Sequence, residues 1–229
     1  MKYISLIIPA KNESLSLGEV LKELKKFKIV NEIIVVVDSE EDNSIPICKD
    51  HNCKYLIQKK KGYGSAIIEG FKFASNEYGC IFNADFSFEP KYLDTMLNKT
   101  IDYDFIFGSR YLKNASSDDD DFITFIGNKC FSFFSRVFLR IKISDILYTY
   151  VLCNVKKFNN LNLKSEDFRL CIELPFEISQ SNCLYCDLPM HERSRFAGKK
   201  NVNILKDGFL ILLEIIISFM KLIKFINKK

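Results

Sequence analysis

The sequence lacks the features that mark several large classes of protein. Its 33 basic and 29 acidic residues leave a net charge of +4 over 229 residues, a balance that does not indicate a nucleic-acid partner. The first apolar run, residues 4–8, is short and is cut by Pro9, so we expect no secretory signal peptide. The one C-x-x-C pair, Cys183 and Cys186, has neither a second pair nor a histidine partner and is weak evidence for zinc. We find no internal repeat and no low-complexity linker.

What is present predicts one globular α/β unit. Hydrophobic residues make up 48% of the chain, enough to bury a substantial core. The eight cysteines are expected to be mostly reduced and buried. Strand-like and helix-like segments alternate, the pattern of a parallel sheet with right-handed crossovers. The expected strands are residues 3–8, 33–37, 55–57, 80–82, 104–107 and 184–188. The expected helices are residues 15–27, with Ser14 as its cap, 45–49, a helix that opens in 59–66 and runs to about 76, and 88–99, 122–139 and 168–179.

The stretch of residues 79–90 is the best candidate for a site. A short apolar strand there ends in Asn83, Ala84 and Asp85, and ligands of open α/β sheets bind beyond the carboxyl ends of strands. Alternation places Asn83 and Asp85 on the same side. An amide oxygen and a carboxylate are hard ligands suited to Mg²⁺ or Mn²⁺ bound to a diphosphate. Taken alone, the tripeptide favours an ordinary polar turn, and only its neighbours favour a site.

Two further segments are candidates for binding a nucleotide. Asp38 follows the second predicted strand, where it could bond a ribose or a base, or cap a helix. Lysines 59–61 precede Gly62, Gly64 and a helix start, which makes a candidate phosphate site without the Walker A ending. By contrast, the acidic run of residues 118–121 is expected to be a solvated loop.

Together these motifs resemble the family-2 glycosyltransferases of GT-A fold, specifically the branch that makes polyprenyl-phosphate sugars. The resemblance covers about residues 3–215 and rests on the order and spacing of motifs that are each weak alone. The motif residues are Pro9, Ala10, Lys11, Asn12 and Glu13; Asp38; residues 61–66; Ala84 and Asp85; residues 108–111; Gly127 and Asn128; Asp145; Glu173; and Arg195 to Gly198. The resemblance implies a Rossmann-like, mostly parallel twisted sheet flanked by helices.

The resemblance also implies a reaction and roles for particular residues. A hexose would move, with inversion, from a UDP- or GDP-linked sugar to a polyprenyl phosphate, with Mg²⁺ or Mn²⁺ as cofactor. The implied donor-binding residues are Pro9, Ala10, Asn12, Glu13, Asp38, Lys61, Gly62, Gly64, Asn83 and Ala84. The implied metal ligands are Asn83 and Asp85, and the implied catalytic residues are Asp85, Asp145, Arg110 and Arg195. Arg110, Arg136 and Arg195 are the implied ligands of the acceptor phosphate.

Three departures from the family pattern keep alternatives open. The first acid of the D-x-D motif is Asn83, the segment after Asp145 reads ILYTYV, and Lys200 is followed by Asn201. A hydroxyl acceptor in surface-glycan synthesis would need a base, for which Asp145 or Glu173 is the candidate. A non-catalytic sugar-nucleotide-binding subunit also fits. A GT-A-like nucleotidyltransferase is disfavoured, because the first strand–helix turn is not glycine-rich.

The C-terminal segment predicts a membrane contact. Residues 209–226 are apolar with three charges and barely long enough to cross a bilayer core. They fit an amphipathic interfacial helix, or a helix packed on the domain. We therefore expect a transferase domain over residues 1–203, a C-terminal helix within 204–229, and a peripheral enzyme at the cytoplasmic membrane face. A homo-oligomer or a membrane-anchoring subunit is a further expected partner.

Overall fold

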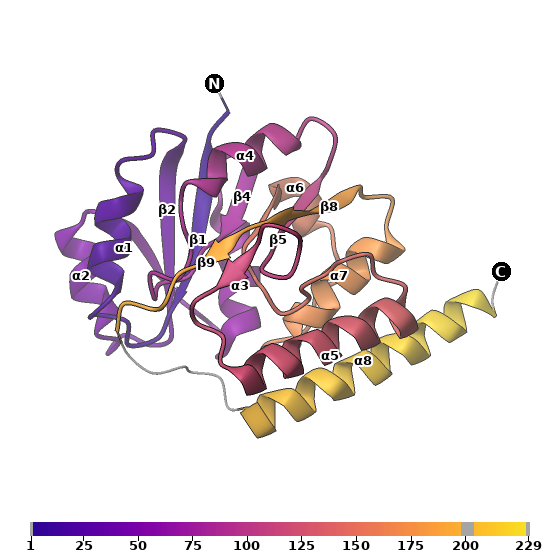
Figure 1. Ribbon diagram of the computed structural model, residues 1–229. Coiled ribbons are helices and arrows are strands. Elements are labelled where there is room, and N and C mark those ends of the chain that lie inside the picture. The colour runs from indigo at the N-terminus through magenta and orange to yellow at the C-terminus, as the bar shows by residue number, and fades with distance from the viewer. Residues whose placement is uncertain (1, 198–203, 228–229) are drawn as a thin grey trace.

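A seven-stranded, mostly parallel sheet forms the centre of the computed structural model, which describes residues 2–197 and 204–227 (Figure 1). Its order is β3-β2-β1-β4-β7-β5-β8, and β7 runs antiparallel to both of its neighbours. The strands are β1 (Ile4–Ala10), β2 (Val30–Val37), β3 (Lys54–Ile57), β4 (Tyr78–Ile81), β5 (Phe105–Ser109), β7 (Val151–Asn154) and β8 (Tyr185–Pro189). The expected α/β class and mostly parallel sheet are confirmed, whereas the reversed direction of β7 within this sheet was not predicted.

Helices cover both faces of the sheet because β1 and β2 are apolar on both sides. Within β1, Leu6 and Ile8 belong to one buried cluster and Ile7 to the other, as alternation along a strand requires. The first cluster includes α1 (Leu17–Leu24), α2 (Ser44–Asp50) and α4 (Tyr92–Lys99). The second includes α3 (Tyr63–Phe73), α6 (Val155–Asn159) and α7 (Leu170–Gln180).

Several local features differ from the expectations. Helix α1 begins at Leu17 after Ser16, without a side-chain cap, so Ser14 is not the cap residue. Two-residue strands β6 (Ser116–Ser117) and β9 (His191–Glu192) pair in parallel, a contact between segments 75 residues apart that has no local sequence signal. All eight cysteines are free thiols.

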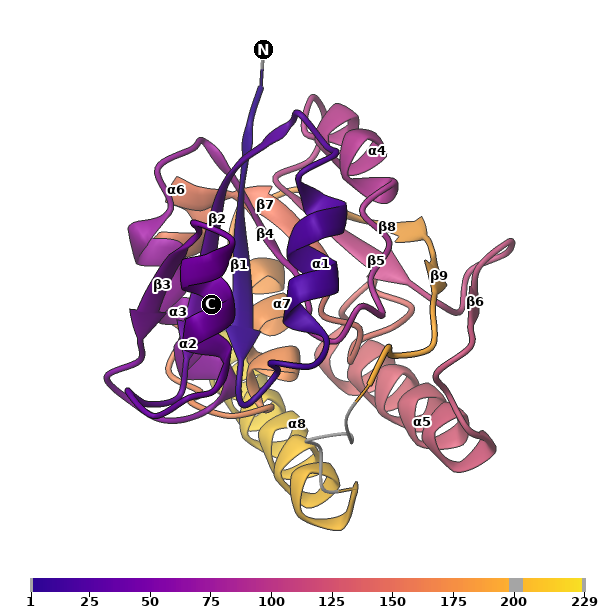
Figure 2. The same cartoon turned by 90° about the vertical axis from the view of Figure 1, so that its left-hand side faces the viewer.

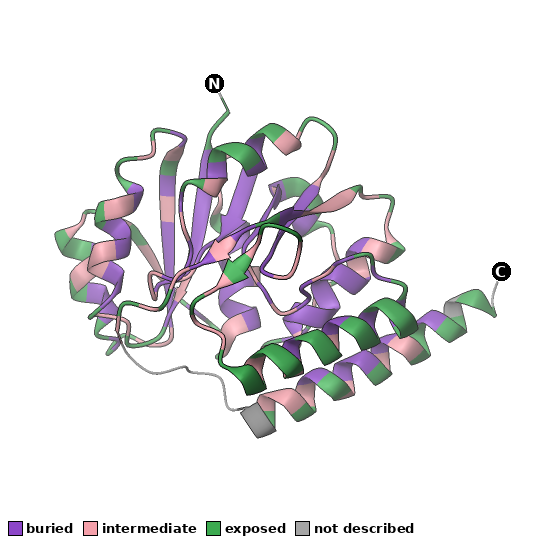
Figure 3. Ribbon diagram, in the orientation of Figure 1, coloured by how far each residue is buried: buried purple, intermediate pink, exposed green. Residues whose placement is uncertain are grey.

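Two long helices lie beyond the carboxyl end of β1 (Figures 1 and 2). They are α5 (Phe122–Leu139) and α8 (Ile204–Ile226), and α8 packs against both α5 and α7. The expected boundary at residues 203 and 204 falls where the described chain resumes, so the division into two units stays a prediction. By length and composition α5 is long and apolar enough to cross a membrane, with 22% of it buried. Figure 3 shows that much of its surface is exposed.

Candidate active site

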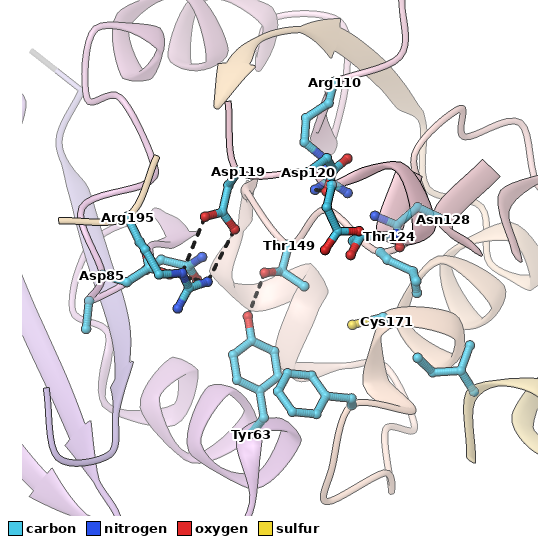
Figure 4. Close-up of a pocket in the computed structure, with 16 residues that line it drawn as sticks. Tyr63, Asp85, Arg110, Asp119, Asp120, Thr124, Asn128, Thr149, Cys171 and Arg195 are labelled. Carbon is cyan, nitrogen blue, oxygen red and sulfur yellow. Dashed lines mark hydrogen bonds and ion pairs between the residues drawn. The ribbon is translucent and has the colours of Figure 1, made fainter. Parts of the chain in front are cut away.

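A pocket of about 320 Å³ lies between the carboxyl edge of the sheet and helices α5, α7 and α8 (Figure 4). One end is polar and is formed by the loop after β4, by Arg195 and by the acidic run of residues 118–121. The other end is more apolar, with contributions from Leu147, Phe168 and Ile211. The pocket therefore joins a region suited to phosphates with a region suited to hydrocarbon.

Asn83 and Asp85 both line the polar end, but so does Ala84 between them, because the chain has left β4 and turns there. The Oδ1 atom of Asp85 accepts hydrogen bonds from the backbone N–H and the hydroxyl of Ser87, at 3.0 and 2.7 Å. The amide of Asn83 donates to the Ser87 Oγ atom at 3.4 Å. A carboxylate and an amide oxygen suit a hard divalent cation. Because no three His, Cys, Asp or Glu side chains of the described residues are placed to hold one metal ion together, such a cation would need further oxygen ligands from substrate or water.

Arg195 lies between two carboxylates at this end of the pocket (Figure 4). Its Nη2 atom is 3.5 Å from Asp85 Oδ2 and 3.4 Å from Asp119 Oδ2. The backbone holds it there, since the N–H of Phe196 donates to the carbonyl of Asp85 at 3.0 Å. Burial would lower the pKa of Arg195, but Asp119 and Asp85 outweigh it and raise that pKa. The guanidinium remains charged and faces the pocket. The later residues of this motif, Gly198 and Lys200, lie outside the described residues.

Arg110 also lines the pocket, but its guanidinium is held by three carboxylates. Asp145 accepts from Nε and Nη2 at 2.7 and 3.0 Å, while Nη1 donates to Asp120 at 3.2 Å and to Glu192 at 3.1 Å. Asp145 is fully buried and is not among the pocket-lining residues. This geometry makes Arg110 and Asp145 a buried ion pair in the wall of the pocket, with the Arg110 guanidinium already bonded to carboxylates and Asp145 out of reach of a ligand.

The expectation of a solvated loop at residues 118–121 is contradicted in part, because Asp118 and Asp121 are exposed but Asp119 and Asp120 are half-buried. Asp119, Asp120 and Asp121 line the pocket. Asp120 accepts from Arg110 and from the Tyr111 hydroxyl, and Asp121 caps α5 at its N-terminus. Arg110 and Arg195 hold Asp120 and Asp119 against the pocket. Local composition gives no signal of this pairing between distant residues.

The structure does not bring two other candidates to this pocket. Arg136 is exposed on α5 and lines a separate depression with Arg140 and Lys142, so it does not join Arg110 and Arg195 around one phosphate. Glu173 is buried, and its carboxylate accepts from the backbone N–H groups of Lys164 and Ser165. It holds a loop and is not placed to act as a base.

The residues expected to bind the nucleoside lie on the adjoining strands. Pro9 and Ala10 end β1, Asn12 and Glu13 follow them, and Asp38 follows β2. The charge of Glu13 acts on Arg195, so the two regions are neighbours.

The Asp38 carboxylate already has partners among the neighbouring side chains. Gln58 donates to it at 2.8 Å, and Lys11 and Lys61 approach it at 3.4 and 3.8 Å. Both lysines are exposed.

Gly62 and Gly64 have a steric role beside the expected phosphate site. A Cβ atom on either residue would lie 2.2 Å from a backbone oxygen, that of Glu166 or of Ser165. Gly62 also has φ of +128°, which favours glycine. The 165–167 segment therefore covers this start of α3, where the N–H of Ser65 donates to the Glu166 carbonyl.

Sequence reasoning missed most of the apolar end. Within residues 146–150, Leu147 and Thr149 face the pocket, whereas Tyr148 and Tyr150 are buried in the core. The Tyr63 hydroxyl donates to Thr149 at 2.6 Å (Figure 4). Alternation in this segment was the available signal, but only the packing shows which of its sides faces the pocket.

Comparisons with known proteins agree with this geometry. The family model described as glycosyl transferase family 2 matches residues 5–161. The dolichol-phosphate mannosyltransferase of Pyrococcus furiosus is 30% identical over 151 residues, which are 62% of this chain and 43% of that protein. An uncharacterised protein of Methanocaldococcus jannaschii is 35% identical over 121 residues, 47% of this chain and 52% of that protein. The chain thus spans about half the length of these curated relatives.

Solved structures extend the likeness to the fold. Glucosyl-3-phosphoglycerate synthase from Mycobacterium tuberculosis, in complex with Mn²⁺, UDP and glucosyl-3-phosphoglycerate, has a TM-score of 0.73 at 11% identity over 95% of this chain and 80% of that one. Mannosyl-3-phosphoglycerate synthase from Rubrobacter xylanophilus has a TM-score of 0.72 at 12% identity over 100% of this chain and 76% of that one. Because the family model covers more than half of the sequence, the chain belongs to glycosyl transferase family 2.

Proposed function

We propose that this enzyme transfers a hexose, with inversion, from a UDP- or GDP-linked sugar to a polyprenyl phosphate at a membrane surface. The observation that carries the proposal is the pocket itself, with Asp85 and Arg195 at one end and an apolar wall at the other. A lipid phosphate has the same two parts, an anionic head and a hydrocarbon chain. The similarity to a dolichol-phosphate mannosyltransferase supports the same acceptor class.

An apolar groove supports the lipid part of the proposal. It lies between α5 and α8 and is lined by Phe134, Phe138, Leu212, Ile215, Ile216 and Phe219. Ile211, which lines the pocket, precedes the first of these α8 residues along the helix. A prenyl chain leaving the pocket at Ile211 would continue along this groove, where burial of its carbons is favourable.

The two candidate bases, Asp145 and Glu173, are already hydrogen-bonded, which favours an acceptor that is anionic before it binds. A hydroxyl acceptor needs a base to remove its proton. Asp145 is bonded twice to Arg110, and Glu173 is bonded to backbone N–H groups. A phosphate oxygen needs no such base. It would attack the anomeric carbon, the bond from that carbon to the diphosphate would break, and the nucleoside diphosphate would leave with the electron pair.

The donor diphosphate would lie near Asn83, Asp85 and Arg195. Asn83 and Asp85 would hold Mg²⁺ or Mn²⁺, which when bound supplies positive charge to the leaving diphosphate. Arg195 would donate hydrogen bonds to phosphate oxygens, and its charge would favour the transition state in a partly buried site. The proposed nucleoside contacts remain Pro9, Ala10, Asn12, Glu13, Asp38 and Lys61, with Ala84 on the donor side. Gly62 and Gly64 instead pack against the backbone of residues 165–167.

The test is transfer of a radiolabelled sugar into an organic-soluble product. The chain is incubated in detergent with UDP- or GDP-sugars, a short-chain polyprenyl phosphate, and Mn²⁺, Mg²⁺ or EDTA. We expect label in the lipid phase with the phosphate but not with the matching prenol. Transfer to the prenol or to 3-phosphoglycerate instead would contradict the proposed acceptor, and binding of sugar nucleotides without any turnover would favour a non-catalytic subunit.

A paired variant tests the donor site without relying on turnover. A donor present at 100 times its dissociation constant adds about 2.7 kcal/mol of stability, so metal with nucleotide should raise the melting temperature. We expect Asp85→Asn to remove that increase. The control is Asp94→Asn, on the exposed side of α4, which should retain it. Equal responses of the two variants would contradict the assignment of Asp85.

A further inference from the structure

Helices α5 and α8 expose many large apolar side chains and bury several polar ones, although α8 also buries Ile211, Ile215 and Leu222 and exposes Lys221 and Lys224. Helix α5 buries Asn128, Ser132 and Ser135, and α8 buries Glu214 and Ser218. The exposed side of α5 carries Phe122, Ile123, Phe125, Ile126, Phe133, Phe134, Val137 and Phe138, and that of α8 carries Phe209, Leu212, Ile216, Met220, Ile223 and Ile226. A contiguous apolar face of this kind marks a contact surface. We call it the α5–α8 face.

A cluster of cations borders this face at the end of α5. Arg136, Arg140 and Lys142 are exposed and line one depression together with Phe133 and Val137 of the α5–α8 face. Within the described chain, none of these three cations forms an ion pair. The one carboxylate in the depression, Asp187, accepts from the backbone N–H and the hydroxyl of Ser144. The depression therefore holds three cations and one carboxylate, an excess of positive charge beside an apolar surface.

We propose that the α5–α8 face docks on an anionic bilayer, with Arg136, Arg140 and Lys142 binding the phosphate groups of its lipids. Apolar side chains enter the interface while long basic side chains reach the head groups, the arrangement of interfacial helices. This inference rests on the proposed function and adds the charge of the membrane and the surface that meets it. Docking in this way would orient the α5–α8 groove toward the lipid phase.

Vesicle flotation tests the charge requirement. The full chain is mixed with vesicles of phosphatidylcholine alone, or of phosphatidylcholine and phosphatidylglycerol in equal amounts. Near an anionic surface each cation contributes about 1 kcal/mol, or about fivefold in partitioning. We therefore expect replacing all three cations by glutamine to weaken binding to the mixed vesicles on the order of a hundredfold at low salt. The matched control removes the same charge from the exposed segment that follows α1, as Lys25→Gln, Lys26→Gln and Lys28→Gln, and should bind like the unaltered chain.

A second pair of variants tests the apolar contact. Phe133 and Ile101 are 61% and 78% exposed, and only Phe133 lies on the α5–α8 face. We expect Phe133→Gln to reduce binding to both kinds of vesicle and Ile101→Gln to leave it unchanged. The exposed thiol of Cys130, one turn before Phe133, gives an independent readout, since mixed vesicles should slow its reaction with a maleimide.

Three results would overturn the inference. These are equal binding to both vesicle types, equal loss in the two glutamine triples, and a dimer in solution that Phe133→Gln dissociates while vesicle binding persists. The last would make the face an interface between copies. Sugar transfer by the unaltered chain to a short-chain lipid phosphate in detergent needs no bilayer. That assay therefore tests the proposed function independently of membrane docking.

Discussion

The most direct test concerns Arg110, which the sequence predicts to bind the acceptor phosphate and which the structure places among buried carboxylates. If its main role is to neutralise buried carboxylates, Arg110→Gln leaves Asp145, Asp120 and Glu192 without their shared cation. Their side chains are 0%, 6% and 8% exposed. Removing one partner of a buried pair costs about 3–5 kcal/mol, which for a domain of this size lowers the melting temperature by about 6–20 °C.

The assay is urea unfolding at neutral pH with a matched exposed pair as control. Arg169 pairs with Asp167, and the two side chains are 30% and 33% exposed, so Arg169→Gln should cost at most about 1 kcal/mol. Arg110→Lys keeps the charge but loses the pair of hydrogen bonds to Asp145. Its stability should fall between those of Arg110→Gln and Arg169→Gln. If Arg110→Gln is no less stable than Arg169→Gln but has lost sugar transfer, Arg110 is a phosphate ligand and the buried-pair assignment is wrong.

Two further predictions concern stability. Burial would raise the pKa of Glu32, but hydrogen bonds from three residues lower it from 4.5 to about 2. An acid whose pKa is lowered in the folded state stabilises the fold at pH values above its unfolded pKa. We therefore expect up to about 3 kcal/mol of the free energy of unfolding to be lost as pH falls from 4.5 to 2. Urea titrations should show Glu32→Gln less stable than the unaltered chain at pH 7 but not at pH 2, and a constant difference would contradict the shift. Gly64→Ala should destabilise the chain, because its Cβ meets backbone oxygens, whereas Gly127→Ala, with nothing within 4 Å, should be neutral or stabilising by up to about 1 kcal/mol.

The engagement of Arg195 has a consequence for donor binding. In the structure its charge is shared by Asp85 and Asp119, and the same Asp85 is the proposed metal ligand. A diphosphate that accepts from Arg195 would leave the Asp85 carboxylate available to a cation. The proposed order is therefore joint binding of nucleotide and metal, which the thermal-shift comparison with EDTA measures directly.

Local patterns in the sequence determined the sheet and the position of the donor side. The apolar runs of β1, β2 and β4 and the polar residues that end them predicted a parallel sheet with Asn83 and Asp85 at its carboxyl edge. These inferences succeed because strand burial and alternation depend on neighbours within a few positions. The length and bounds of α5 were also predicted, since an 18-residue aromatic run forms a helix in either a core or an interface.

Only the tertiary structure decided what the charged side chains do. Arg110, Asp145 and Glu192 are up to 82 residues apart, yet they form one buried cluster, while Arg136 points away from the pocket that Arg110 lines. The acidic run of residues 118–121 became part of the site because Arg110 and Arg195 hold it there. Composition cannot distinguish a solvated charge from a paired one, since the difference lies in which distant segment packs against it.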